Sequence, residues 1–141
     1  MRKEFGCLLF VLVFFVVQGY GQDQRGRQEA EVRAVIAKFA DARNTHNLPA
    51  LIALYADDAE AISQNGGLRR GRSAILEMWT IQVKTVDHVD RTISQIDLPS
   101  PNIAVVHVSG QYPPPMGVHE EVFVLVSENG NWKIHVNQQI K

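Results

Sequence analysis

Apolar residues recur at helical spacing in the first half of the chain. Between residues 32 and 40 they fall at i, i+3, i+4, i+7 and i+8, which predicts one face of an amphipathic helix, and Arg43 continues that face. Asn47 before Leu48 and Pro49 indicates a second helix, because Asn caps free N–H groups and proline fits the first turn. A third helix is expected from about Ser73.

The spacing changes to alternation after these helices. A short strand is expected at residues 59–64, and four longer segments follow that are rich in β-branched and aromatic residues and are bounded by turn-forming residues. The longer segments are Thr85–Asp97, Ile103–Tyr112, Val118–Ser127 and Trp132–Ile140. Helices followed by strands predict an α+β domain, with three N-terminal helices packed on one face of a curved antiparallel sheet.

The last two strands have a predictable register. Asn129-Gly130 is the preferred two-residue hairpin turn, because both positions need a positive φ. If Glu128 faces Asn131, the predicted pairs are Leu125–Ile134, Phe123–Val136, Glu121–Gln138 and His119–Ile140. We assign this face to the helices, so that its polar end lines a pocket.

The N-terminal segment has the pattern of an export signal. Arg2 and Lys3 precede an apolar run over residues 7–17, and small residues at Gly19 and Gly21 fit a cleavage site. A membrane anchor is the alternative, but the run is shorter than the roughly 20 residues that span a bilayer. We therefore expect a cleaved signal over 1–21, a flexible lead-in over 22–28, and one domain over 29–141. The mature protein would be secreted or periplasmic, and not bound to a membrane.

The composition narrows the chemistry. The chain has 14 basic and 15 acidic residues. It therefore lacks the excess of basic residues that binding to nucleic acid requires, and we do not expect nucleic acid as a partner. Its single Cys lies inside the predicted signal, which excludes thiol catalysis, disulfides and Cys-ligated metals in the mature chain. The His residues show no metal-binding spacing, and no Gly-x-Gly-x-x-Gly fingerprint is present. We expect no metal and no cofactor.

Five segments in this order carry a resemblance to a known family: residues 35–47, 51–59, 70–75, 103–107 and 129–134. Together they resemble the SgcJ/EcaC-type proteins of the nuclear-transport-factor-2-like superfamily, which also holds ketosteroid-isomerase and polyketide-cyclase (SnoaL) types. The resemblance implies a cone-shaped domain that encloses a pocket and is commonly a homodimer. The superfamily contains isomerases, cyclases, dehydratases, hydrolases and proteins without catalysis, so the fold alone does not define the activity.

Arg43 and Glu121 are the leading catalytic candidates, since both are predicted to face the space between helices and sheet. A carboxylate in an apolar pocket can move protons, but the two residues can equally form a structural ion pair, or Arg43 can extend to solvent. His107 is either a pocket acid or base or a hydrogen-bonded interior imidazole. Asp58 is either a solvated turn residue or part of the pocket.

The remaining predicted lining is mostly aromatic. It consists of Phe39, Tyr55, Trp79, His119, Phe123 and Gln138, where core packing is the alternative for the residues at helical spacing. We expect an exported protein that binds a small, partly apolar molecule, with cofactor-independent proton transfer of isomerase, cyclase or hydrolase type as its chemistry. The alternative is a non-catalytic dimeric binding or assembly module that uses the face of Val122, Val124 and Val126.

Overall fold

The computed structural model describes residues 5–140, with side chains described from residue 21 onward. The predicted signal, residues 1–21, therefore lies almost wholly outside the residues whose side chains are described. Helix α1 spans Phe5–Asn44. It includes residues 22–28, which we expected as a flexible lead-in; Gln, Arg and Glu are good helix formers, and Gln28 also donates a 2.7 Å hydrogen bond to the Pro101 carbonyl.

In the part of the chain that the structure describes, no helix is long and apolar enough to cross a membrane.

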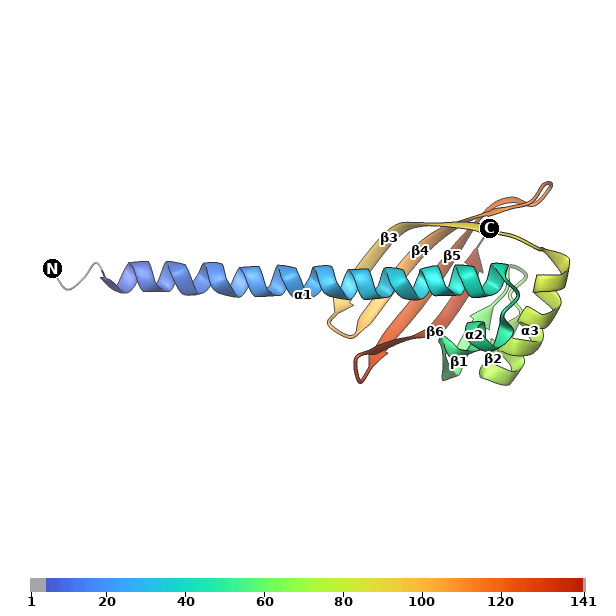
Figure 1. Cartoon of the computed structure of the whole chain (residues 1–141), viewed down its shortest axis with the longest axis horizontal. Helices are drawn as coiled ribbons and strands as arrows, with labels where there is room; N and C mark the ends of the chain where they lie inside the picture. The colour runs from blue at the N-terminus through green and yellow to red at the C-terminus, as the bar shows by residue number, and fades with distance from the viewer. Residues whose placement is uncertain (1–4, 141) are drawn as a thin grey trace.

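Two shorter helices follow at one end of the sheet (Figure 1). Helix α2 covers Leu48–Ala53, and the Asn47 side chain caps it by accepting a 3.1 Å hydrogen bond from the Ala50 N–H, as predicted. Helix α3 covers Arg72–Thr85 and begins after Gly71, whose φ of 82° is open to glycine but strained for other residues. Chain direction thus changes sharply at both helix starts.

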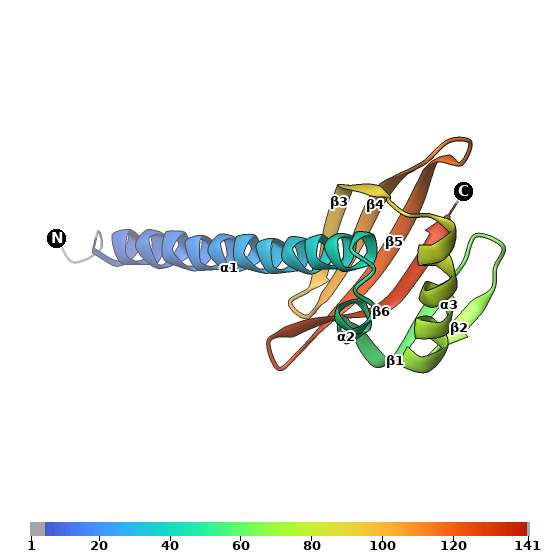
Figure 2. The same cartoon turned by 45° about the vertical axis from the view of Figure 1, so that its right-hand side comes forward.

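The six strands form one sheet in the order β2-β1-β6-β5-β4-β3. Their bounds are β1 Tyr55–Ile62, β2 Leu68–Arg70, β3 Asp90–Ser100, β4 Ile103–Tyr112, β5 Gly117–Glu128 and β6 Asn131–Ile140. All neighbours are antiparallel except β1 and β6, which are parallel. The sheet curves around the helices, which lie on one of its faces (Figures 1 and 2). The predicted α+β class is confirmed.

The β5–β6 hairpin follows the predicted register only near its turn. Asn129 and Gly130 both have positive φ, and Leu125 pairs with Ile134 as expected. His135 is then an extra residue without a partner, so a β-bulge moves the remaining pairs by one position. These pairs are Val124–Val136, Phe123–Asn137, Val122–Gln138 and Glu121–Gln139. The prediction that Gln138 faces the helices is therefore wrong: Gln138 is exposed, and Gln139 takes its place beside Glu121.

The core between α1, α3 and the sheet is aromatic. Phe39 packs edge to face against Phe123, Trp79 and Tyr55, with ring centroids 4.9, 5.5 and 6.4 Å away. The Trp79 indole N–H donates to the Tyr55 hydroxyl at 3.1 Å, and all four side chains are at most 1% exposed. The sequence predicts that these residues line a pocket. In the structure they fill the hydrophobic core, so an open cavity can lie only beyond them.

Candidate functional site

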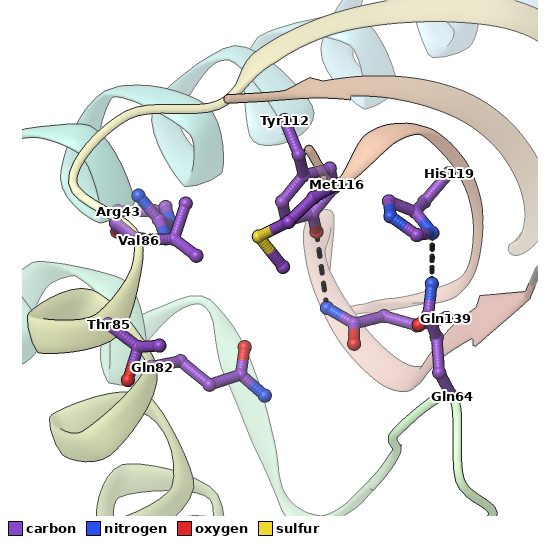
Figure 3. A pocket seen from close by; sticks show the side chains of 9 residues that line it. All are labelled: Arg43, Gln64, Gln82, Thr85, Val86, Tyr112, Met116, His119 and Gln139. Atoms are coloured by element: carbon purple, nitrogen blue, oxygen red, sulfur yellow. Dashed lines mark hydrogen bonds between the residues drawn. The ribbon is translucent and has the colours of Figure 1, made fainter. Parts of the chain in front are cut away.

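A cavity of about 220 Å³ lies at the end of the domain where α1 and α3 end (Figure 3). Side chains from the helix ends, the β1–β2 loop, the β4–β5 hairpin and β6 surround it. They are Arg43, Gln64, Gln82, Thr85, Val86, Tyr112, Met116, His119 and Gln139. Of the residues predicted to form the site, the cavity thus contains Arg43 and His119.

Arg43 reaches this cavity from the last turn of α1 and is 1% exposed. Its terminal nitrogens donate to the carbonyls of Asp87 at 2.8 Å and Val86 at 2.5 Å. These bonds tie the end of α1 to the segment between α3 and β3. Burial lowers the pKa of Arg43, and the positive charge of Arg91 lowers it further. Arg43 forms no ion pair with any residue of the described chain, and its Nε has no hydrogen-bond partner there.

Glu121 lies on the inner face of β5 and is paired with Arg91 of β3. Two parallel hydrogen bonds of 2.9 and 3.0 Å join the guanidinium to the carboxylate, and both side chains are 1% exposed. The pair spans the intervening strand at Gly110, where an added Cβ would lie 3.6 Å from Oε1 of Glu121. Burial by itself lowers the pKa of Arg91. The negative charges and hydrogen bonds of the neighbouring groups, chiefly Glu121, together have the larger effect, so the pKa of Arg91 is raised overall. The partner of Glu121 is therefore Arg91 and not Arg43.

Tyr112 connects this ion pair to the cavity. Its hydroxyl donates a 2.7 Å hydrogen bond to Oε1 of Glu121 and accepts one from Nε2 of Gln139 at 3.3 Å. Burial raises the pKa of Tyr112, and the negative charge of Glu121 raises it further. The phenol therefore stays neutral. Glu121 thus accepts three hydrogen bonds, two from Arg91 and one from Tyr112, and serves as a structural acceptor.

His119 is the imidazole side chain that lines the cavity. Its Nδ1 contacts Nε2 of Gln64. Its Nε2 is buried and has no hydrogen-bond partner among residues 21–140. The ring also packs edge to face on Tyr112, with centroids 4.8 Å apart. His119 is thus held in place by Gln64 and Tyr112, and its second ring nitrogen is unpartnered in the described chain.

Three predicted site residues lie elsewhere. His107 is on the outer face of β4, since the residues on either side of it, Val106 and Val108, are the buried ones. The Asp58 side chain is 86% exposed on β1, 4.0 Å from His135. Gln138 is exposed because of the bulge in β6. The expectation that these side chains face the pocket does not hold, because strand alternation points each of them outward.

Three functional residues were absent from the sequence prediction. Arg91, Tyr112 and Gln139 are buried or half-buried and alternate with exposed residues on their strands. For Arg91 and Tyr112 that alternation was a usable signal, whereas Gln139 depends on the bulge. Among the described residues, no group of three or more His, Cys, Asp or Glu side chains is arranged to hold a metal ion.

Together, the cone of sheet and helices and the polar cavity at its open end define a class: NTF2-like, or cystatin-like, domains. The chain belongs to the family of SnoaL-like domains, whose family model matches residues 36–134. No curated protein sequence matches the chain significantly.

Solved structures share the fold at low sequence identity. A domain of unknown function with a cystatin-like fold from Nostoc punctiforme is 16% identical over 81% of this chain and 76% of its own, with a TM-score of 0.72. An NTF2-like protein of unknown function from Pseudomonas putida is 20% identical over 79% and 84%, with a TM-score of 0.68. A ketosteroid isomerase-like protein from Erwinia carotovora atroseptica is 20% identical over 79% and 94%, with a TM-score of 0.66.

Proposed function

We propose that this protein binds a small, partly apolar organic molecule in the cavity between Arg43 and His119. The observation that carries the proposal is that Arg43 and His119, which both line this cavity, each hold a buried nitrogen without a partner in the described chain, Nε of Arg43 and Nε2 of His119. Buried polar groups are normally satisfied, and a ligand that reaches these two side chains would satisfy them. Val86 and Met116 supply apolar wall. At about 220 Å³ the cavity is smaller than the roughly 300–1,000 Å³ typical of drug-sized ligands.

Proton transfer on the bound molecule, without a cofactor, is the second candidate function. His119 favours it, because imidazole is the side chain most often used for general acid and base catalysis and this ring keeps one nitrogen toward the cavity. The likeness to a ketosteroid isomerase-like protein is consistent with such chemistry. The reaction would be of isomerase, cyclase or hydrolase type, with His119 in the proton-transfer role that the sequence suggests for Glu121 and His107.

Native mass spectrometry of gently purified protein tests the binding function. We expect a bound mass below that of a drug-sized ligand, lost on denaturation and much reduced in the His119→Ala variant. His107→Ala is the matched control, because it removes an imidazole from the outer face of the sheet. A protein that carries no ligand, and takes up none from a broad library of small metabolites, would contradict the proposal. If the wild-type protein converts the identified ligand and the His119→Ala variant does not, the catalytic function is supported as well.

Export and membership of the SgcJ/EcaC-type group are further parts of the proposal. The basic start, the apolar run over residues 7–17 and the small residues Gly19 and Gly21 support a cleaved signal. Expression of the full chain should therefore yield an exported protein that begins at Gln22. An intact mass that still includes residue 1 in the exported fraction would contradict cleavage.

A non-catalytic dimeric module is the alternative function, and its support is the outer face of β5. Val122, Val124 and Val126 are half-buried there and form a row of apolar groups. Sedimentation velocity distinguishes the two possibilities when it is combined with the ligand measurements. A homodimer that Val124→Lys dissociates, together with an absence of any bound molecule, would favour the assembly module.

A further inference from the structure

The buried charges beside the cavity do not balance. Arg43, Arg91 and Glu121 each have a side chain that is about 1% exposed, so two guanidinium groups share one carboxylate. Glu121 gives both of its oxygens to Arg91 and Tyr112. The cluster therefore keeps one positive charge in excess, and that charge resides on Arg43, the member that lines the cavity.

Within residues 21–140, the close partners of Arg43 are all neutral. Its terminal nitrogens bond to the carbonyls of Val86 and Asp87, with a weaker contact to the side-chain oxygen of Asn44 at 3.4 Å. The Asp87 carboxylate is 90% exposed, lies 3.2 Å from His46, and is screened by water. Arginine keeps its charge in proteins, and an isolated buried charge is costly unless it is paired.

The lowered pKa of Arg43 agrees with this imbalance. Burial and the positive charge of Arg91 lower the pKa of Arg43 by more than Tyr112, Glu121 and Asp87 raise it. An anion bound beside the guanidinium would raise the pKa of Arg43.

We infer that the ligand of this cavity is a small organic carboxylate whose charged end lies against Arg43. This inference rests on the proposed binding function and adds the chemical class of the ligand. A carboxylate only accepts hydrogen bonds, so it suits the guanidinium of Arg43, which lines the cavity, and it supplies the missing negative charge. Arg43 and His119 lie on opposite sides of the cavity (Figure 3). The other end of the ligand therefore carries a polar group that hydrogen-bonds to the imidazole of His119, with apolar atoms against Val86 and Met116 between the two ends.

Matched pairs of small acids and their amides test the inference, because each pair differs in charge and hardly in shape. The panel contains benzoate with benzamide, 4-oxopentanoate with its amide, and cyclohexanecarboxylate with its amide, at constant pH and ionic strength. The methyl signal of Met116 in an NMR titration reports binding at the cavity, since this side chain lines it. We expect the acids to bind at least about tenfold more tightly than their amides.

Two variants connect the preference to Arg43. Arg43→Gln should bring the acid-to-amide affinity ratio close to one. Arg69→Gln is the control, because it removes the same charge from the exposed strand β2; it should keep the wild-type ratio. If Arg43→Gln fails to fold, the comparison of acids with amides on the wild-type protein still decides the question by itself.

The outcomes separate the inference from the proposed function. Amides that bind as tightly as acids would overturn the carboxylate and leave the binding function in place. An acid preference that survives in folded Arg43→Gln would also overturn it, because the charge would then be recognised elsewhere. If no member of any pair moves the Met116 signal, and the metabolite library gives no bound mass either, the binding function and the inference both fail.

Discussion

Replacement of Glu121 by Gln should destabilise the fold strongly, because it removes the only carboxylate among the buried charges described here. In Glu121→Gln, Arg91 and Arg43 stay buried with no negative group between them. One side-chain oxygen is kept, but the new NH₂ group faces an N–H of Arg91 in either orientation of the amide, and a guanidinium only donates.

The expected loss is about 3–5 kcal/mol, the usual cost of removing one partner from a buried ion pair. Both side chains are 1% exposed, so solvent screening does not reduce it. A domain of this size has about 5–15 kcal/mol of stability in total. The melting temperature should therefore fall by on the order of 10–20 °C.

Urea denaturation followed by circular dichroism measures this loss. Glu60→Gln is the matched control, because Glu60 pairs with Arg70 at 2.7 Å on the exposed edge of the sheet and should cost no more than about 1 kcal/mol. The double variant Arg91→Met/Glu121→Leu should cost less than Glu121→Gln alone, since it leaves no unmatched half of the pair. A Glu121→Gln protein within about 1 kcal/mol of wild type would refute the account of the buried charges.

Four further predictions follow from the described contacts. Burial raises the pKa of Tyr55 and Tyr112 above the ordinary value of about 10 that the unfolded chain keeps, so the stability they contribute is complete below pH 10 and declines above it. Urea titrations from pH 9 to 11 should show a fall of up to about 1.4 kcal/mol per pH unit for each phenol, and absorbance at 295 nm should show no tyrosinate from these two residues before unfolding. Gly71→Ala should cost about 1–3 kcal/mol in urea denaturation, because its φ of 82° is strained with a side chain present; no change would mean that the helix start can rearrange. Phe39→Ala should cost about 3–5 kcal/mol, since three other aromatic rings pack on that ring; a loss below 1 kcal/mol would show that the core collapses into the space. His107→Ala should leave ligand binding unchanged in native mass spectrometry, and a lost ligand would place the site on the outer face instead.

Much of the fold could be predicted because its signals are local. The apolar face of α1 was visible as a spacing of residues, and Val32, Ile36 and Phe39 are indeed buried. The hairpin turn was visible as Asn129-Gly130, and both residues have positive φ. The parallel pairing of β1 with β6 was not predictable in this way, because it joins segments that are distant along the chain.

The site was harder to predict because it depends on which strands are neighbours. Burial of Arg43 and Glu121 was correctly expected, but the partner of Glu121 comes from β3, on the far side of β4. Alternation places Arg91 on the same face of its strand as Val89 and Ile93, but nothing in the sequence indicates that this face meets Glu121. His107 was misplaced for a related reason: an apolar strand does not reveal which of its two faces packs on the helices.

The bulge in β6 has a consequence for how this cavity could be altered. If the bulge moved from His135 to the end of the strand, Val136, Gln138 and Ile140 would face inward, in place of Asn137 and Gln139. The last part of one strand thus encodes two different inner faces, one with two amides and one with two aliphatic groups and a single amide. The position of the bulge can therefore change ligand preference in this domain without a substitution at any residue that now lines the cavity.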